Sequence, residues 1–170
     1  MAGSPGDDLV DVVDDDGRVV GRATRREMRA RRLPHRSTYV LVFNRRGELF
    51  VHLRTATKDV YPSHWDVCVG GVVAAGESFD DGAARELREE LGVEARLERL
   101  FPMRHEDAST IVHGVVYRAT HDGPFRLQEE EIVRGEFVRV EEVLERAARE
   151  RFCPDGLQVL LRYRDDRASG

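Results

Sequence analysis

The stretch "GGVVAAGESFDDGAARELREELGV", residues 70–93, begins with two glycines and continues with the pattern of a helix. Ser78 is followed three residues later by Asp81, which is the spacing of a helix N-cap with an acidic first turn. Gly92 is the residue type that most often ends a helix, in the left-handed conformation. The segment therefore predicts an amphipathic helix over residues 78–91, directly after a glycine loop.

Three glutamates of this predicted helix are close enough to repel one another. About 100° per residue places Glu86, Glu89 and Glu90 on one stripe, and the apolar side of the helix is then formed by Ala84, Leu87 and Leu91. Arg85 offsets only part of the repulsion, because an exposed ion pair contributes about 0.3–0.5 kcal/mol. Oxygen-rich clusters suit Mg²⁺ or Mn²⁺, and Mg²⁺ is usually completed by substrate phosphates. Taken alone, however, such a stripe is more often a solvated acidic face.

The residues around the stripe decide between these two interpretations, because their spacing resembles the Nudix box. Gly71, Glu77, the run Arg-Glu-Leu at 85–87, the glutamates at 89–90 and Gly-Val at 92–93 match that motif without substitution or gap. The resemblance implies an α/β Nudix fold, with a mixed β-sheet sandwiched between α-helices. It also implies a pyrophosphohydrolase that cleaves the diphosphate linkage between a nucleoside, or a similar organic group, and another group. The implied cofactor is Mg²⁺ or Mn²⁺.

The same resemblance implies a role for each matching residue. Glu86, Glu89 and Glu90 are the expected metal-binding carboxylates, together with the carbonyl oxygen of Gly70. Glu86 is also a candidate general base, and Glu89 and Arg85 belong to the expected catalytic set. Glu77 and Arg85 are expected to orient the ligands. This assignment is chemically consistent, since a bound cation neutralises phosphoryl charge and lowers the pKa of the attacking water.

A second resemblance concerns "FNRRGELFVHLRTATKDVYPSHWDV", residues 43–67, which is similar to the corresponding stretch of isopentenyl-diphosphate isomerases, themselves Nudix relatives. It implies that Arg54 and Lys58 contact the substrate diphosphate. Lys58 is the chain's only lysine. Two explanations are equally good: the site needs a compact ammonium group, or one lysine was retained by chance. His35 falls where those isomerases place a metal-binding histidine, although a histidine at the start of a strand is more often structural.

Four other positions depart from the isomerase pattern. The isomerase's catalytic cysteine would align with Gly70, a metal-binding histidine with Val72, and two late glutamates with Thr110 and Val112. We therefore expect a hydrolase that shares isomerase-like sequence around an intact box. An isomerase-like enzyme and a non-catalytic, nucleotide-sensing Nudix module remain the alternatives.

Further candidates lie outside the box. Glu129, Glu130 and Glu131 precede a predicted strand, and Glu130 or Glu131 is the best candidate for an additional ligand or base, with a solvated turn as the alternative. "RHED" at 104–107 is a weaker candidate for the same role. Trp65 could stack on a substrate group, but a place in the core is the simpler interpretation. Tyr61 and His64 are likewise undecided between the active site and a structural role.

Composition restricts the classes of function. The 170 residues carry a net charge of −5, with no basic surplus that would favour nucleic-acid binding. The apolar runs fall far below the roughly 18 residues needed to cross a membrane, and the N-terminus lacks the pattern of a secretory signal. We therefore expect a cytoplasmic protein that binds a small-molecule diphosphate. We also expect one domain over residues 1–170, with the Nudix core at about 35–140. Oligomeric state stays open, with a homodimer as one possibility.

The remaining pattern predicts the other elements. Residues 9–13 and 18–24 read as a hairpin, and 25–32 as a short helix. Residues 38–43 and 49–54 are expected to pair as strands, followed by short strands at 66–69 and 71–74. Later strands are expected at 96–105, 110–119 and 132–139, and closing helices at 140–151 and 155–164.

Overall fold

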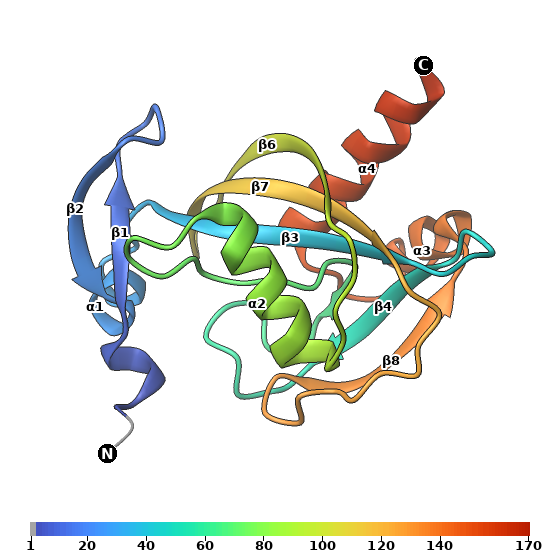
Figure 1. Ribbon diagram of the computed structural model, residues 1–170, viewed down its shortest axis with the longest axis horizontal. Coiled ribbons are helices and arrows are strands. Elements are labelled where there is room, and N and C mark those ends of the chain that lie inside the picture. The colour runs from blue at the N-terminus through green and yellow to red at the C-terminus, as the bar shows by residue number, and fades with distance from the viewer. Residues whose placement is uncertain (1–2) are drawn as a thin grey trace.

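The computed structural model describes residues 3–170 and contains one mixed β-sheet with helices on both faces (Figure 1). Its strands are β1 (Leu9–Val13), β2 (Val19–Thr24), β3 (His35–Phe43), β4 (Leu49–Arg54), β5 (Trp65–Asp66), β6 (Glu98–Glu106), β7 (Ile111–Thr120) and β8 (Ile132–Val138). Its helices are the short 3₁₀-helix η1 (Pro5–Asp7), α1 (Arg25–Ala30), α2 (Phe79–Leu91), α3 (Val140–Ala147) and α4 (Pro154–Ala168).

The long strand β3 organises the sheet. It runs parallel to β7 from the pair His35–Val112 to the pair Phe43–Thr120, and β6 continues the sheet antiparallel to β7. On its other side, β3 meets β1 at one end and β4 at the other. Strand β4 then pairs with both β5 and β8. The parallel pair among antiparallel ones confirms the predicted mixed sheet.

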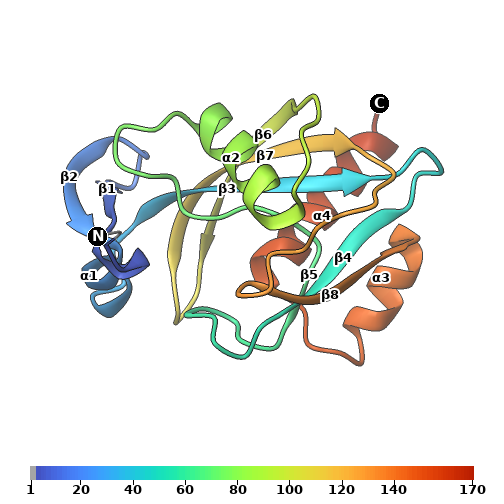
Figure 2. The same ribbon diagram turned by 60° about the horizontal axis from the view of Figure 1, so that its bottom comes forward.

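Alternate side chains of β3 enter two different cores, as expected for a strand buried on both faces. Val40 and Val42 pack with Leu87 and Leu91 of α2. Leu41 belongs to a second cluster, to which α3 and α4 contribute Val143, Val159 and Leu160. Figure 1 shows α2 in front of β3 and α4 behind it, and Figure 2 shows the same layers after a turn. This arrangement confirms the predicted sandwich.

The N-terminal segment forms its own corner of the molecule. The β1–β2 hairpin is closed by Asp14, whose Oδ1 accepts hydrogen bonds from the backbone of Asp16 and Arg18, both at 2.9 Å. Helix α1 then begins at the cap Thr24, which accepts from the Glu27 N–H at 3.1 Å. Both elements were predicted from sequence, with α1 two residues shorter than expected. In Figure 1 they lie at the β1 end of β3.

One local prediction was wrong. Residues 67–74 form only isolated bridges, including Val40–Val69 and Ser37–Val72, rather than two short strands, because two consecutive glycines interrupt the extended backbone. The strands around the turn at 44–48 pair as predicted, through Phe43–Leu49, and separate beyond that pair. Each then pairs with a strand from the C-terminal half, which satisfies its backbone hydrogen bonds along the rest of its length. Within residues 3–170, no helix is long and apolar enough to cross a membrane.

Candidate active site

Helix α2 holds the three glutamates between well-defined ends. The Ser78 hydroxyl accepts from the Asp81 N–H at 3.1 Å, and Gly92 adopts the left-handed conformation with φ 68°. Both ends agree with the prediction from sequence. The burial of Glu90 was not predicted. Glu90 is only 5% exposed and lies on the side of the helix that faces the sheet. The three glutamates therefore differ in environment instead of sharing one exposed stripe.

The glycine loop before α2 passes very close to β3. Gly70 has φ 151°, and a Cβ at this position would overlap the backbone oxygen of Thr38. A Cβ on Gly71 would lie 2.8 Å from Oε1 of Glu86. Both positions therefore require glycine for reasons of space, and at Gly70 also for its backbone conformation. The loop can reach the glutamates only because these two residues lack side chains.

Gly70 contacts the glutamates through its backbone. Its N–H donates to Oε2 of Glu90 at 3.0 Å. Its carbonyl oxygen accepts no hydrogen bond from any residue in the described part of the chain. An unpaired carbonyl beside two carboxylates is a ready oxygen ligand for a hard cation.

Arg85 binds three carboxylates at once, those of Glu77, Glu86 and Glu89. Its guanidinium makes a bidentate pair with Glu77 at 2.8 and 2.9 Å. Its Nη1 donates to Oε1 of Glu86 at 2.9 Å and to Oε2 of Glu89 at 3.1 Å. The carboxylate of Glu77 also accepts from the Ala74 N–H at 3.1 Å, which ties the network to the glycine loop. The structure thus brings Arg85 and Glu77 against the glutamates, as the sequence predicted.

Burial perturbs the two inner carboxyl groups. The pKa of Glu90 is raised well above its usual value, first by burial and then by the neighbouring charge of Glu86. Burial and the charge of Glu89 raise the pKa of Glu86, against the opposing effect of Arg85. Glu89 is the outer member, with a side chain that is 47% exposed. Two adjacent carboxyl groups with raised pKa values, one buried and one partly buried, mark a candidate functional site that a bound cation would neutralise.

A cleft of about 630 Å³ opens in front of these groups. The glycine loop, Glu86, Glu89 and Glu90 line one wall of the cleft. Lys58 and Glu131 also line the cleft, close enough to Glu90 to affect its pKa, and their side chains form an ion pair. The structure therefore brings together the box, the predicted diphosphate-binding lysine and one of the predicted extra carboxylates. The backbone of η1 and β1 also reaches this cleft, through Pro5, Leu9 and Val10.

The donor set fits a hard divalent cation in chemistry, since it consists of carboxylates and one unpaired carbonyl. Within residues 3–170, however, no group of three or more carboxylate, imidazole or thiol side chains is placed to hold one ion. The reason is visible in the contacts, since Glu86 and Glu89 turn to Arg85 while Glu90 turns to Gly70. The protein alone therefore supplies an incomplete set of ligands, which water or the phosphate oxygens of a substrate would complete.

The other candidate residues lie in different surroundings. Arg54 donates to the carbonyls of Val60 at 2.8 Å and Tyr61 at 3.3 Å, and its Nη1 lies 3.6 Å from Asp66. Glu130 lies beside Lys58 along an adjoining groove, outside the cleft itself, and Glu129 is exposed. Lys58 is thus the member of the predicted arginine–lysine pair that reaches the cleft.

Residues that the sequence left undecided contact other protein groups. Trp65 is 9% exposed and stacks on Phe152, so the core interpretation is confirmed. Cys68 is a buried free thiol in the same core. The Tyr61 hydroxyl donates to Asp107 of the "RHED" run and lies 3.1 Å from Nε2 of His105. His64 contacts the carbonyl of Pro62 at 2.9 Å.

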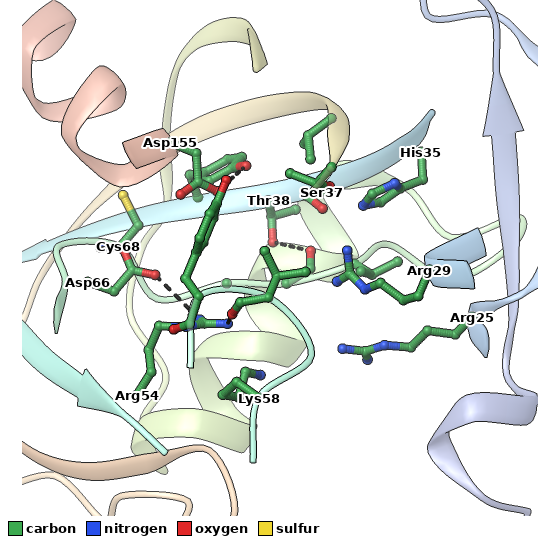
Figure 3. Close-up of a pocket in the computed structure, with 18 residues that line it drawn as sticks. Arg25, Arg29, His35, Ser37, Thr38, Arg54, Lys58, Asp66, Cys68 and Asp155 are labelled. Carbon is green, nitrogen blue, oxygen red and sulfur yellow. Dashed lines mark hydrogen bonds and ion pairs between the residues drawn. The ribbon is translucent and has the colours of Figure 1, made fainter. Parts of the chain in front are cut away.

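His35 lies at the start of β3 and is 1% exposed. Its Nδ1 lies 2.9 Å from the carbonyl oxygen of Leu33, whereas its buried Nε2 has no partner among the described residues. Burial, with a contribution from Arg29, lowers the pKa of His35 to about 4, so the ring is neutral at pH 7. The ring faces a small inner pocket rather than the glutamates (Figure 3).

Sequence reasoning missed two residues of that inner pocket. Arg25 and Arg29 of α1 point into it next to His35 (Figure 3), and Arg25 also lines the main cleft. Their i,i+4 spacing on a predicted helix was a usable signal, because two arginines on one face repel unless something anionic is near.

Comparison with known proteins agrees with this geometry. The NUDIX domain family model matches residues 33–156. The chain is 43% identical to the uncharacterized Nudix hydrolase PA4841 of Pseudomonas aeruginosa, over 93% of this chain and 94% of that protein. It is also 43% identical to the uncharacterized Nudix hydrolase SCO1686 of Streptomyces coelicolor, over 95% of this chain and 91% of that protein. The crystal structure of DR0079 from Deinococcus radiodurans superposes with a TM-score of 0.82 at 29% identity, covering 91% of this chain and 98% of that one. The chain therefore belongs to the Nudix hydrolase family.

Proposed function

We propose that this Nudix hydrolase cleaves the diphosphate linkage between a nucleoside, or a similar organic group, and a second group, with water as the nucleophile and Mg²⁺ or Mn²⁺ as cofactor. One observation carries the proposal. Two adjacent carboxyl groups with raised pKa values, the buried Glu90 and the partly buried Glu86, lie beside the unpaired carbonyl of Gly70 at the wall of an open cleft. Buried like charges are costly unless a cation neutralises them.

The proposed metal ligands are Glu86, Glu89, Glu90 and the carbonyl oxygen of Gly70. A divalent cation bound there would neutralise charge on the phosphoryl oxygens and lower the pKa of the attacking water. The chain's own contribution is placement. Arg85 holds Glu86 and Glu89 on one side, and the Gly70 N–H holds Glu90 on the other.

Glu86 is the proposed general base. Its Oε1 accepts from Arg85, so Oε2 is the oxygen that we expect to take the proton of the attacking water. The pKa of this carboxyl is raised by burial, which brings it closer to the working pH of a base than that of an exposed glutamate. Glu131 is a proposed additional carboxylate, because it lines the same cleft.

Lys58 is the proposed contact for the substrate diphosphate. Lys58 lines the same cleft as the glutamates, and its ammonium group pairs with Glu131, with which a diphosphate would compete. We keep Arg54 as a second proposed contact. Its Nε and Nη2 already donate to backbone carbonyls, so only Nη1, 3.6 Å from Asp66, is left to reach a phosphate.

A hydrolysis screen tests the proposal. Nucleotide sugars, dinucleotides, coenzyme A derivatives and isopentenyl diphosphate are incubated with the enzyme and Mg²⁺ or Mn²⁺. Cleavage of an internal diphosphate yields two phosphomonoesters, so inorganic phosphate appears only after alkaline phosphatase is added. Hydrolysis of isopentenyl diphosphate instead yields isopentenyl phosphate and inorganic phosphate, which is measured without alkaline phosphatase. We expect at least one substrate class to be cleaved, with no cleavage in EDTA or by Glu86→Gln.

Three outcomes contradict the proposal. The first is no cleavage of any class, and the second is cleavage that survives both EDTA and Glu86→Gln. The third is conversion of isopentenyl diphosphate to its allylic isomer without any hydrolysis, which would favour the isomerase alternative. Tight nucleotide binding without turnover would favour the sensing module.

A further inference from the structure

An inner pocket of about 80 Å³ adjoins the cleft and holds unpaired polar atoms (Figure 3). Three residues that line it each carry a buried side-chain atom without a hydrogen-bond partner in the described chain: Nε of Arg29, Nε2 of His35 and Oγ1 of Thr110. His35 is 1% exposed and Thr110 is 3% exposed. Because buried polar groups are nearly always paired, three unpaired atoms around one space indicate a ligand that is bound there in function.

Positive charge gathers at one end of this pocket. Arg25 and Arg29 lie one turn apart on α1, and both guanidinium groups point into the pocket in Figure 3. Their nearest carboxylate is Asp59, at 4.0 and 3.9 Å, and its side chain is 57% exposed and therefore well screened by water. This pair of arginines is incompletely neutralised by the protein.

The acidic residues of the pocket lie at its other end and are already satisfied. Asp66 accepts from the Cys68 N–H at 3.0 Å, and Asp155 accepts from the Tyr39 hydroxyl at 2.9 Å. Figure 3 shows both on the side away from Arg25 and Arg29. An anion is therefore expected at the arginine end only.

The unpaired atoms also specify hydrogen-bond directions. Nδ1 of His35 faces the Leu33 carbonyl, so it carries the proton, and Nε2 of the neutral ring is left as an acceptor. Nε of Arg29 is a donor, and the Thr110 hydroxyl can act either way. A bare anion would satisfy Arg29 but not His35. The complementary ligand offers an anionic oxygen and, next to it, a hydroxyl donor.

We propose that the inner pocket binds a hydroxyl-bearing anionic group, of the kind found in a sugar phosphate, that forms one end of the substrate. The pocket far exceeds the roughly 10–15 Å³ that a single water needs. It shares Arg25, Lys58 and Gly70 with the cleft, so one molecule can occupy both. This assignment of substrate class rests on the proposed hydrolase function, because the same substrate's diphosphate would lie at the glutamates.

The test uses glycerol 3-phosphate, which carries an anion and neighbouring hydroxyls but no diphosphate. Binding to the full chain is measured by calorimetry in EDTA, and the side-chain ¹⁵N signal of His35 reports whether the ligand reaches Nε2. We expect saturable binding and a shift of that signal. At pH 8 methyl phosphate is a dianion without a hydroxyl group, so it is expected to bind at least about 10-fold more weakly, since it leaves Nε2 unpaired.

Two variants and a control locate the site. Thr110→Val removes a hydroxyl that has no partner in the free protein, so the fold should be unaffected while affinity falls about 10-fold. Arg29→Gln should lower affinity about 10- to 100-fold. Arg31→Gln is the control from the end of the same helix, because that side chain is 64% exposed and pairs with Glu27. It should bind like the wild type.

Several results would overturn the proposal. They are no binding by the wild type, wild-type affinity of Thr110→Val or Arg29→Gln for glycerol 3-phosphate, binding of methyl phosphate as tight as that of glycerol 3-phosphate, or an unchanged His35 signal. Failure of the proposed hydrolase function is distinguishable, because the probe has no diphosphate and the assay contains no divalent cation. Normal binding in this assay, with no hydrolysis of any diphosphate in the screen, would count against the hydrolase function only.

Discussion

Glu90→Gln separates the contribution of Glu90 to metal binding from its contribution to the fold. The Glu90 carboxyl is buried and its pKa is raised well above the usual value, first by burial and then by Glu86, so its charged form is costly in the absence of a cation. Glutamine has the same shape and keeps an oxygen that can accept from the Gly70 N–H, which in the wild type lies 3.0 Å from Oε2 of Glu90. We expect kcat to fall at least about 100-fold while the variant folds normally.

The magnitudes can be worked out from these contacts. A hydrogen bond to a charged acceptor contributes about 1.5–3 kcal/mol, and one to a neutral acceptor contributes about 1 kcal/mol. Replacing the Glu90 carboxylate by an amide therefore lowers the free energy of unfolding by about 1 kcal/mol. Removal of the buried charge has the opposite effect. A cation at 100 times its Kd adds about 2.7 kcal/mol to the free energy of unfolding. For a chain of this size that raises Tm by about 5–11 °C in the wild type. Glu90→Gln should lose most of this increase.

The pH dependence has a definite sign. Because the folded-state pKa of Glu90 is raised above the unfolded value near 4.5, its contribution to stability is present below pH 4.5 and is lost as the pH rises through the folded-state pKa. In EDTA, the variant should therefore gain stability relative to the wild type as the pH rises above 4.5. Denaturant unfolding at pH 5 and pH 8 measures this difference.

The assay combines thermal unfolding, with Mg²⁺ or with EDTA, and turnover at saturating Mg²⁺. Glu94→Gln is the control, because that side chain is 81% exposed and lies just beyond the end of α2. The control should keep both the metal-dependent rise in Tm and the wild-type kcat. A Glu90→Gln protein with the same metal-dependent rise, or with wild-type turnover, would refute the assignment of Glu90 as a ligand.

Three further predictions concern residues that support the site. Gly70→Ala should lower the free energy of unfolding by about 3 kcal/mol, measured by denaturant titration, because its Cβ would overlap the backbone oxygen of Thr38; an unchanged midpoint would contradict this. Arg85→Lys should cost about 1–3 kcal/mol and lower kcat, since an ammonium cannot reproduce the bidentate pair with Glu77; wild-type values of both would show that the pairing is dispensable. His52, whose pKa is lowered to about 3 by burial, stabilises the fold above pH 6.5 and loses that contribution as the pH falls toward 3. His52→Leu should therefore flatten the acid limb of a pH–stability curve, and an equally steep limb would contradict the reasoning.

Features with a local cause could be predicted from sequence. The ends of α2 follow from Ser78 and Gly92, whose preferences depend on a few neighbouring residues. The network of Arg85 and Glu77 follows from the spacing of the box, and the structure brings these side chains together at 2.8 Å. The roles that the box implies for its glutamates stay predictions.

Features set by distant packing could not be predicted. Glutamates are rarely buried, and the angle at which α2 meets the sheet, which buries Glu90, is not encoded within the helix. The separation of β3 from β4 likewise depends on β7 and β8, which lie far along the chain. The inner pocket requires α1 to fold against β3, so Arg25 and Arg29 could be noticed in the sequence but not placed beside His35.

The corner formed by η1, β1, β2 and α1 lies before residue 33, where the match to the family model begins. It nevertheless supplies Pro5, Leu9 and Arg25 to the cleft and Arg29 to the pocket beside it. Part of the surface that we propose for substrate binding is therefore built by a segment separate from the box. Exchange of this leading segment could alter the arginine side of the proposed pocket without altering a single residue of the box.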